Sequence, residues 1–341
     1  MTRITIYWAV ILCAIIGCGQ QDSELNIFTW SNYISDEIVG GFKQEAGIQK
    51  VSVTTYDSNE SLLARLQAGA KGYDIVMPSD YMVSIMIKQG LLAEINKANI
   101  PNFANISRFT DQYFDPGNQY SVPFNWGTAG IAYDSAMLEE TPDSWVVFWD
   151  KKHQGKFSLL DDMRECFAVA LKSLGYSVNT TNPQELEAAK LKLIQQKPLV
   201  KRYDSQAAEA LLAGEVIMAH AWSGDAFRAA SEKPTIRYTI PKEGGTVFID
   251  NICIPKDAPH KETAEKFINY LLRPEINAKI TDFTQYATCI DAARQYVNPE
   301  LRDNPIIYLP DEIMARLEWL KDLGDFLPQY DLAWTEVKAS Q

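Results

Sequence analysis

Histidine and cysteine are scarce in this sequence, which limits the metal and disulfide chemistry that it can support. The 341 residues include 3 histidines and 5 cysteines, and none of them forms an HExxH or a CxxC motif. Cys13 and Cys18 lie near the N-terminus, so that Cys166, Cys253 and Cys289 remain. An odd number without paired spacing is typical of neither a disulfide framework nor a zinc site. We therefore expect no metal and no cofactor.

Positive charge is also in deficit. Lysine and arginine number 32 against 44 aspartate and glutamate residues, which gives a formal net charge of -12. An anionic protein is repelled by phosphate backbones, so no nucleic-acid partner is expected. The sequence also lacks a phosphate-binding loop, a nucleophile elbow and a dinucleotide fingerprint. We therefore expect a protein that is not an enzyme.

Long apolar runs are rare as well. The run Ile4–Ile16 has 13 residues, fewer than the ~20 that a membrane-spanning helix needs, which argues against an uncleaved anchor. Its end, Ile15–Cys18, resembles a bacterial lipobox. We expect residues 1–17 to be a cleaved signal peptide, Cys18 to be lipidated and residues 18–24 to form a tether. No later segment could span a membrane, so we expect an extracytoplasmic protein held to a bacterial membrane by lipid.

Apolar runs and amphipathic stretches alternate along the rest of the chain, which has 46% hydrophobic and 22% charged residues. Such alternation predicts an α/β fold, and about 320 residues suffice for two lobes. Predicted strands are 25–29, 51–55, 73–77, 156–160, 216–221 and 247–254. Predicted helices are 36–46, 59–68, 82–89, 162–174, 183–195, 205–212, 224–230 and 261–272. We expect Asp57 and Thr181 to cap the second and fifth of these helices.

Two stretches are candidates for passages between the lobes. Residues 120–133 are rich in aromatic, glycine and β-branched residues and could carry the chain out of the first lobe. The segment Pro241–Gly245 interrupts the pattern before the chain returns. Two such passages predict a hinge.

Carboxylates and aromatic rings recur just after several predicted strands. In open α/β sheets, ligands bind beyond the carboxyl ends of the strands, so these side chains are expected to share one site. Each also has a structural explanation: Asp162 and Glu165 have the spacing of a capping box, and Ser223 could cap a helix beside Asp225. Asp250 is harder to explain structurally, because it interrupts an apolar strand where an ionised group needs a partner.

Several motifs together resemble those of the spermidine/putrescine-binding proteins, the extracytoplasmic receptors of polyamine ABC transporters. The resemblance covers residues 25–341, and the motifs are Phe28–Tyr33, Tyr73–Tyr81, Leu160–Glu165, Lys242–Gly245 with Phe248–Asp250, and Leu271–Pro274. It implies a bilobal periplasmic-binding-protein fold of type II, a monomer that closes on its ligand and delivers it to permease subunits. We expect the first lobe to combine 25–128 with 249–295, and the second 129–248 with 296–341.

The resemblance also implies which side chains bind the ligand. Carried over position by position, they are Trp30, Ser31, Tyr33, Ser79, Tyr81, Asp162, Glu165, Trp222, Asp225, Phe248, Asp250 and Tyr286. Phe248 and Asp225 look more like putrescine receptors than spermidine receptors. Leu320 stands where a glutamine amide is expected to assist one ammonium, and Asn32 replaces a frequent acidic residue. These departures favour putrescine, while dual or spermidine binding stays open.

Two other functions use similar residues. The pairs Asp162–Glu165 and Asp225–Asp250 could serve a hydrolase as general acid and base. The same acidic and aromatic groups could also serve a receptor or sensor for another cationic solute. A quaternary ammonium needs aromatic faces but few carboxylates, so the many acidic residues here favour a polyamine.

Overall fold

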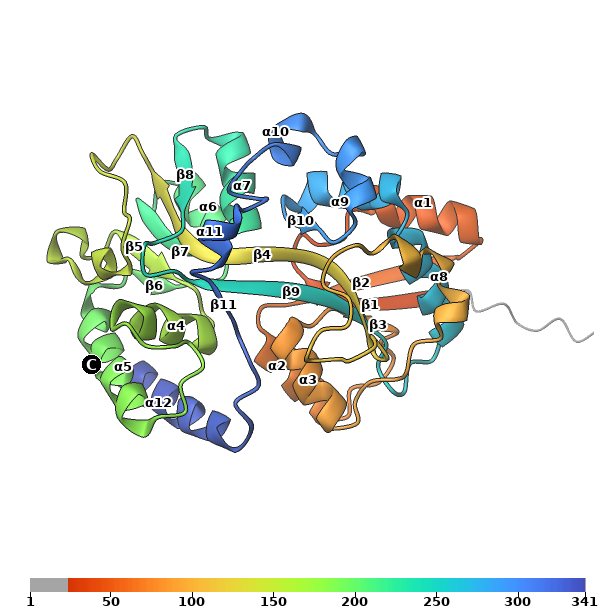
Figure 1. Cartoon of the computed structure of the whole chain (residues 1–341), viewed down its shortest axis with the longest axis horizontal. Coiled ribbons are helices and arrows are strands. Elements are labelled where there is room, and N and C mark those ends of the chain that lie inside the picture. The colour runs from red at the N-terminus through yellow and green to blue at the C-terminus, as the bar shows by residue number, and fades with distance from the viewer. Residues whose placement is uncertain (1–23, 341) are drawn as a thin grey trace, which may run out of the picture.

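The computed structural model describes residues 24–340. The chain forms two α/β lobes that lie side by side and are joined by two long strands, β4 and β9 (Figure 1). The strands are β1 (Glu24–Trp30), β2 (Lys50–Tyr56), β3 (Ile75–Val76), β4 (Ser121–Asp134), β5 (Phe157–Leu159), β6 (Arg202–Tyr203), β7 (Met218–Trp222), β8 (Ile236–Thr239), β9 (Thr246–Cys253), β10 (Ala287–Thr288) and β11 (Glu318–Trp319).

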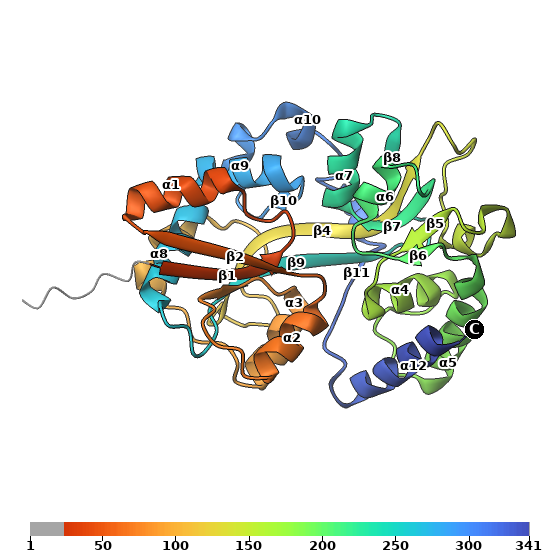
Figure 2. The same cartoon turned by 180° about the vertical axis from the view of Figure 1, so that it is seen from behind.

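The helices cover both faces of the sheet in each lobe (Figure 2). They are α1 (Asp36–Ala46), α2 (Asn59–Gln67), α3 (Asp80–Lys88), α4 (Met163–Ser173), α5 (Pro183–Gln196), α6 (Ala207–Leu212), α7 (Ser223–Glu232), α8 (Lys261–Leu271), α9 (Pro274–Thr284), α10 (Pro299–Arg302), α11 (Asp311–Met314) and α12 (Leu327–Ala339). None of these described helices has the length and apolar character of a membrane span.

The strands form one continuous sheet in the order β2-β1-β3-β9-β4-β7-β5-β6. β1 runs parallel to β2 and β3, and β5 runs parallel to β6 and β7. All 14 residues of β4 are buried: its first half pairs with β9 and its second half pairs with β7 and β8. β4 is therefore part of both lobes. This is the outward passage predicted for residues 120–133.

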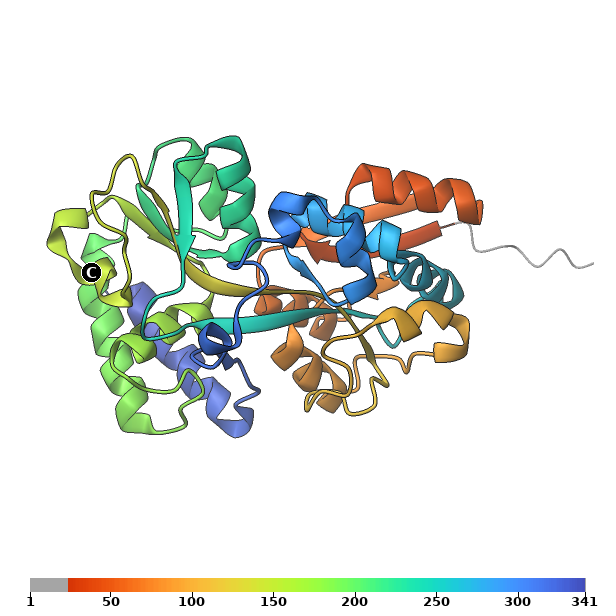
Figure 3. The same cartoon turned by 45° about the horizontal axis from the view of Figure 1, so that its top comes forward.

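The chain passes between the lobes a third time after α10. Figure 3 shows this segment running past β4 and β9 to reach α12 in the other lobe. On the way, β11 adds to the edge of β9, pairing Glu318 with Thr246 and Trp319 with Val247. We propose the lobe division expected from the sequence, whose boundaries at 128–129 and 248–249 fall inside β4 and β9.

Most of the predicted elements are confirmed. Helix α1 shows why they could be predicted from the sequence. Ser35 accepts a hydrogen bond from the Ile38 amide and caps the helix, whose first turn carries acidic residues. Ile38 and Phe42 form the buried stripe. Gly47, with φ of 67°, ends the helix in the left-handed conformation that glycine adopts without strain. Each signal is local in sequence.

The two predicted caps were wrong by one residue. Ser58, not Asp57, caps α2, because its hydroxyl accepts from the Ser61 amide while the Ser61 hydroxyl accepts from the Ser58 amide. Asn182, not Thr181, caps α5. In the first case the shift leaves Asp57 exposed and free to face the cleft.

The sequence did not predict the longer elements α9, α12 and β8, nor the short elements α10, α11, β6, β10 and β11, and β4 was predicted as a passage and not as a strand. The predicted signal peptide, the tether up to residue 23 and the lipidated Cys18 lie outside the described residues.

Candidate functional site

One cavity is lined by side chains from both lobes. All twelve side chains selected from the sequence line it. They are Trp30, Ser31 and Tyr33 after β1, Ser79 and Tyr81 at the start of α3, Asp162 and Glu165 at the start of α4, Trp222 and Asp225 around the start of α7, Phe248 and Asp250 in β9, and Tyr286 before β10. Segments that are far apart in the sequence thus meet at one cavity, as expected from their positions near strand ends.

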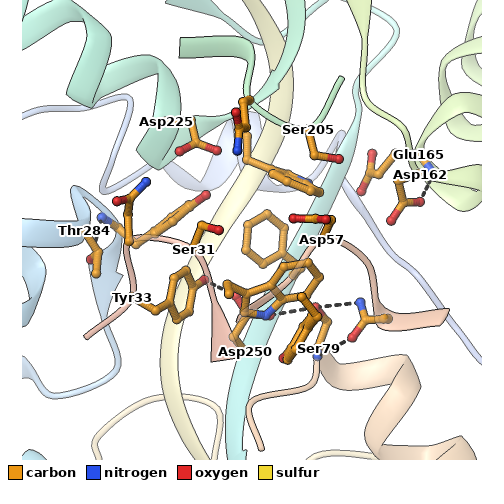
Figure 4. Close-up of a pocket in the computed structure, with 18 of the residues that line it drawn as sticks. Ser31, Tyr33, Asp57, Ser79, Asp162, Glu165, Ser205, Asp225, Asp250 and Thr284 are labelled. Atoms are coloured by element: carbon orange, nitrogen blue, oxygen red, sulfur yellow. Dashed lines mark hydrogen bonds between the residues drawn. The ribbon is translucent and has the colours of Figure 1, made fainter. Parts of the chain in front are cut away.

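Asp250 lies on the floor of this cavity with only 2% of its surface exposed. Its carboxylate accepts hydrogen bonds from the Tyr33 hydroxyl and, at 2.6 Å, from the Ser79 hydroxyl (Figure 4). The Asn59 side chain donates a hydrogen bond to the Ser79 hydroxyl and accepts one from the Ser79 backbone amide, each at 3.1 Å. Burial raises the pKa of Asp250 to about 6, although the two hydroxyl bonds oppose this rise. No cationic side chain of the described residues contributes to that balance.

Two aromatic side chains beside this floor are fixed by one backbone carbonyl. The Trp30 indole donates to the Met77 oxygen at 2.9 Å, and the Tyr56 hydroxyl donates to the same oxygen at 2.6 Å. Trp30 also meets Trp222 from the other lobe edge to face, with ring centroids 5.8 Å apart. The two tryptophans, one from each lobe, therefore contact each other in the lining of the cavity.

Asp162 and Glu165 form a second acidic group. Asp162 caps α4 by accepting a hydrogen bond from the Glu165 amide at 2.9 Å. The same side chain also lines the cavity, so it has both roles that the sequence offered for it. The two oxygens of the Glu165 carboxylate accept from the Thr246 hydroxyl at 2.8 and 2.9 Å, and one of them lies 3.6 Å from the His220 Nε2 atom. Burial, Glu60 and Glu165 hold the pKa of Asp162 well above its usual range.

Asp225 differs from the other acids because it already has a cationic partner. The Arg228 Nη2 atom lies 3.1 Å from Asp225 and also 3.1 Å from Glu209, which extends from α6. Burial raises the pKa of Asp225 to about 6, Arg228 opposes this rise and Glu209 adds to it. A guanidinium that bridges two carboxylates therefore forms part of the cavity wall.

Tyr286 stands between Asp225 and Asp250, and both carboxylates raise its pKa further above the level set by burial. Its ring packs edge to face on Phe248 at 5.9 Å and lies 5.7 Å from the Tyr33 ring. A Cβ atom at Gly224 would lie 2.5 Å from this ring, and one at Gly127 would lie 2.8 Å from it. Two glycines thus make room for the tyrosine.

The Tyr81 hydroxyl is bonded to a residue that does not line the cavity. It donates to Glu60 at 3.0 Å, and the Arg164 guanidinium lies 5.5 Å from its ring centroid. Its ring still lines the cavity, so we expect it to contact apolar parts of a ligand.

Several lining residues were not selected from the sequence. They are Tyr56, Asp57, Asn59, Ser205, Gln206, Glu209, Arg228 and Thr284. Asp57 could have been found, because it follows β2 just as the tryptophan motif follows β1. Arg228 carried no such signal, since its position depends on how α6 and α7 pack.

The chemistry of the lining suits an organic cation. Six carboxylates (Asp57, Asp162, Glu165, Glu209, Asp225, Asp250) and seven aromatic rings (Trp30, Tyr33, Tyr56, Tyr81, Trp222, Phe248, Tyr286) surround the space. Arg228 is the one basic residue among the described lining residues. The described part of the chain holds no group of three or more ligating side chains arranged for a metal ion.

Comparison with known proteins places this architecture in a family. A spermidine/putrescine-binding periplasmic protein of Salmonella typhimurium is 36% identical over 95% of this chain and 94% of its own. The putrescine-binding periplasmic protein SpuD of Pseudomonas aeruginosa is 37% identical over 96% of each chain. A solved ABC transporter protein of Listeria monocytogenes, 34% identical, superposes with a TM-score of 0.90 over 94% of this chain and 100% of its own.

The expected fold, that of type II periplasmic binding proteins, is confirmed by these structural neighbours. The family model for bacterial extracellular solute-binding proteins matches residues 37–308. The chain is a member of the bacterial extracellular solute-binding protein family.

Proposed function

We propose that this protein is an extracytoplasmic receptor for short linear polyamines, which it delivers to the permease of an ABC transporter. The observation that carries the proposal is Asp250: a buried carboxylate that faces the cavity, accepts from two hydroxyls and has no cationic partner in the described chain. An isolated buried carboxylate is costly, and a ligand ammonium would supply the missing charge. The names of the relatives, which bind spermidine or putrescine, support the choice of cation.

The remaining lining residues have roles that follow from polyamine chemistry. A polyamine alternates ammonium groups with apolar methylenes. We assign one ammonium to Asp250 and another to the Asp162–Glu165 group, where each charge-assisted hydrogen bond contributes ~1.5–3 kcal/mol. The rings of Trp30 and Trp222 would cover the methylenes and add ~0.5–2 kcal/mol per cation–π contact.

Ligand occupancy would favour lobe closure. Empty, the cavity holds acidic groups that repel one another: burial is the main cause of the raised pKa of Asp162, and the charges of Glu60 and Glu165 raise it further. A bound polycation would relieve this repulsion and make contacts to both lobes at once. Those contacts exist together only in the closed arrangement, so binding shifts the population toward it.

Putrescine is our preferred ligand among the polyamines. Leu320, an apolar side chain, lines the cavity where an amide would help to hold the terminal ammonium of a longer amine. Phe248 offers a smaller ring than tryptophan at the same wall, and Asn32 contributes no charge. Leu320→Gln should therefore raise the affinity for spermidine relative to putrescine.

The remaining parts of the proposal concern the protein's setting. We propose that Cys18 carries lipid, that the mature protein is a monomer on the outer side of a bacterial membrane, and that it catalyses no reaction. The acidic groups that a hydrolase would use have a sufficient role as ammonium partners.

Calorimetric titration tests the function. The mature chain, residues 18–341 with Cys18→Ser to prevent lipidation, is unfolded and refolded to remove carried ligand, and then titrated with putrescine, cadaverine, spermidine and spermine. Choline and arginine are the controls. We expect micromolar or tighter binding of one or two polyamines and none of the controls. Binding of choline or arginine alone would replace the polyamine proposal with another cationic solute.

A further inference from the structure

Arg228 is unusual in a cavity otherwise lined by acids. Its Nη2 atom lies 3.1 Å from Asp225 on its own helix α7 and 3.1 Å from Glu209 on α6. About a fifth of each of the Arg228 and Asp225 side chains is exposed, against half of Glu209. A cation that belongs to the protein is therefore already bound at this part of the cavity wall.

Four of the six lining carboxylates lie in three separate places around the cavity, whereas Asp57 is exposed and Glu209 shares Arg228 with Asp225. Figure 4 shows Asp225, Asp250 and the Asp162–Glu165 pair on different sides of it. Asp250 receives only hydroxyl donors, and Glu165 faces a hydroxyl and a histidine. Asp225 alone of these four carboxylates has an arginine within 4 Å among the described residues.

Resting on the proposed polyamine function, we propose that Arg228 is a specificity-determining residue. Its guanidinium occupies the Asp225 position as a built-in cation. Two buried anionic positions, Asp250 and the Asp162–Glu165 pair, stay open and match the buried part of the cavity to a diamine, while the exposed Asp57 is solvated and contributes little. A triamine brings one more ammonium than the open positions accept. That ammonium would meet the like charge of Arg228, and like charges at contact distance disfavour binding.

Removing the guanidinium should open the third position. In Arg228→Gln, Asp225 and Glu209 lose their shared partner and can accept an ammonium. One new charge-assisted hydrogen bond corresponds to roughly tenfold in affinity. We expect the affinity for spermidine to rise about tenfold, and the affinity for putrescine to change by less than about threefold, because a diamine already fills the two open positions.

Two further variants separate this effect from a general change in charge. Arg237 is exposed on β8 of the same lobe, so Arg237→Gln removes one positive charge away from the cavity and should leave the spermidine-to-putrescine ratio unchanged. The double variant Arg228→Gln/Asp225→Asn removes both members of the pair. It should return the ratio to the wild-type value, because no freed carboxylate remains.

The experiment is titration of the refolded mature chain and the three variants with putrescine and spermidine, with thermal unfolding as a check of folding. A ratio that rises in Arg228→Gln and falls back in the double variant supports the proposal. An unchanged ratio in Arg228→Gln, or an equal rise in Arg237→Gln, overturns it while leaving the receptor function intact. If the wild-type protein binds neither amine, the receptor function and this inference both fail.

Discussion

Asp250 and Asp225 line the same cavity but have different partners within the protein. Burial raises the pKa of both to about 6. Asp250 receives the hydroxyls of Tyr33 and Ser79 and no protein cation, whereas Asp225 is paired with Arg228. The difference shows that a carboxylate in a binding cavity is not by itself a ligand contact. What matters is whether the protein has already supplied its counter-charge.

The largest effect should come from Asp250→Asn. The substitution keeps the shape of the side chain but removes the charge that we assign to a ligand ammonium. Loss of one charge-assisted hydrogen bond, ~1.5–3 kcal/mol, should weaken putrescine binding about 10- to 100-fold. The thermal midpoint of the free protein should not fall, because a buried charge without a protein cation is removed. Unchanged binding by calorimetry would make Asp250 a structural residue.

A substitution at Gly224 should displace Tyr286, the ring that lies between Asp225 and Asp250. In Gly224→Ala, the new Cβ would lie 2.5 Å from the Tyr286 ring, which stands between the acids, so that the ring or the helix must move. Such overpacking typically lowers the free energy of unfolding by ~1–3 kcal/mol. We expect denaturant unfolding to show this loss and titration to show weaker putrescine binding.

A matched control is Gly40→Ala on α1. A Cβ there has no atom within 4 Å, and Gly40 is not among the residues that line the cavity. Its affinity should equal that of the wild-type protein. If Gly224→Ala also left affinity and stability unchanged, the close packing of Tyr286 would not matter for the site.

Acid should have opposite effects on folding and on binding. Because the folded-state pKa values of Asp250 and Asp225 lie near 6, above the usual 3.8, the folded protein binds more protons than the unfolded chain between these values. The contribution of these groups to stability is therefore present below about pH 4 and is lost as the pH rises through 6.

Ligand affinity should change in the other direction, since an ammonium needs the charged carboxylate. Below pH 6, one required deprotonation weakens binding by about tenfold per pH unit. Titrations from pH 5 to 7.5 measure this slope, and thermal unfolding of the free protein measures the stability over the same range. A slope that persists fully in Asp250→Asn would assign the titration to another group.

The smallest effect should come from the double variant Asp225→Asn/Arg228→Gln. It removes one negative and one positive charge that already neutralise each other. We expect putrescine affinity to stay within about threefold of the wild-type value, because the net charge of the cavity is unchanged and neither group is assigned to an ammonium of the diamine. A loss as large as that in Asp250→Asn would show that Asp225 contacts the ligand in spite of Arg228.

Local sequence signals were sufficient for most elements. The buried stripe and the terminal cap of α1 could be read directly, because both depend on residues within a few positions of each other. The same reading erred at Asp57: two adjacent side chains could each cap α2, and only backbone geometry selects Ser58. β4 was read as a passage and not as a strand, because its Gly127, Gly130 and Pro123 weaken the strand pattern.

The site was predictable to the extent that it follows strand ends. Trp30, Ser79 and Asp250 come after or within predicted strands, and all three line the cavity, although the full set of ligand side chains was taken from the family resemblance. Arg228 was missed, since a basic residue in the middle of a helix is ordinarily solvated. Its place depends on the packing of α6 against α7, which no local pattern encodes.

The sequence by itself determined the α/β alternation, the strand ends that carry acids and rings, and the resemblance to a receptor family. These depend on hydrophobic periodicity and on residue types at fixed spacing. Only the tertiary structure decided that β4 serves both lobes, that Tyr33 and Ser79 bind Asp250, and that Arg228 neutralises Asp225. The reason is physical: burial and pairing of charges depend on which distant segments meet, and that is set by the packing of the whole chain.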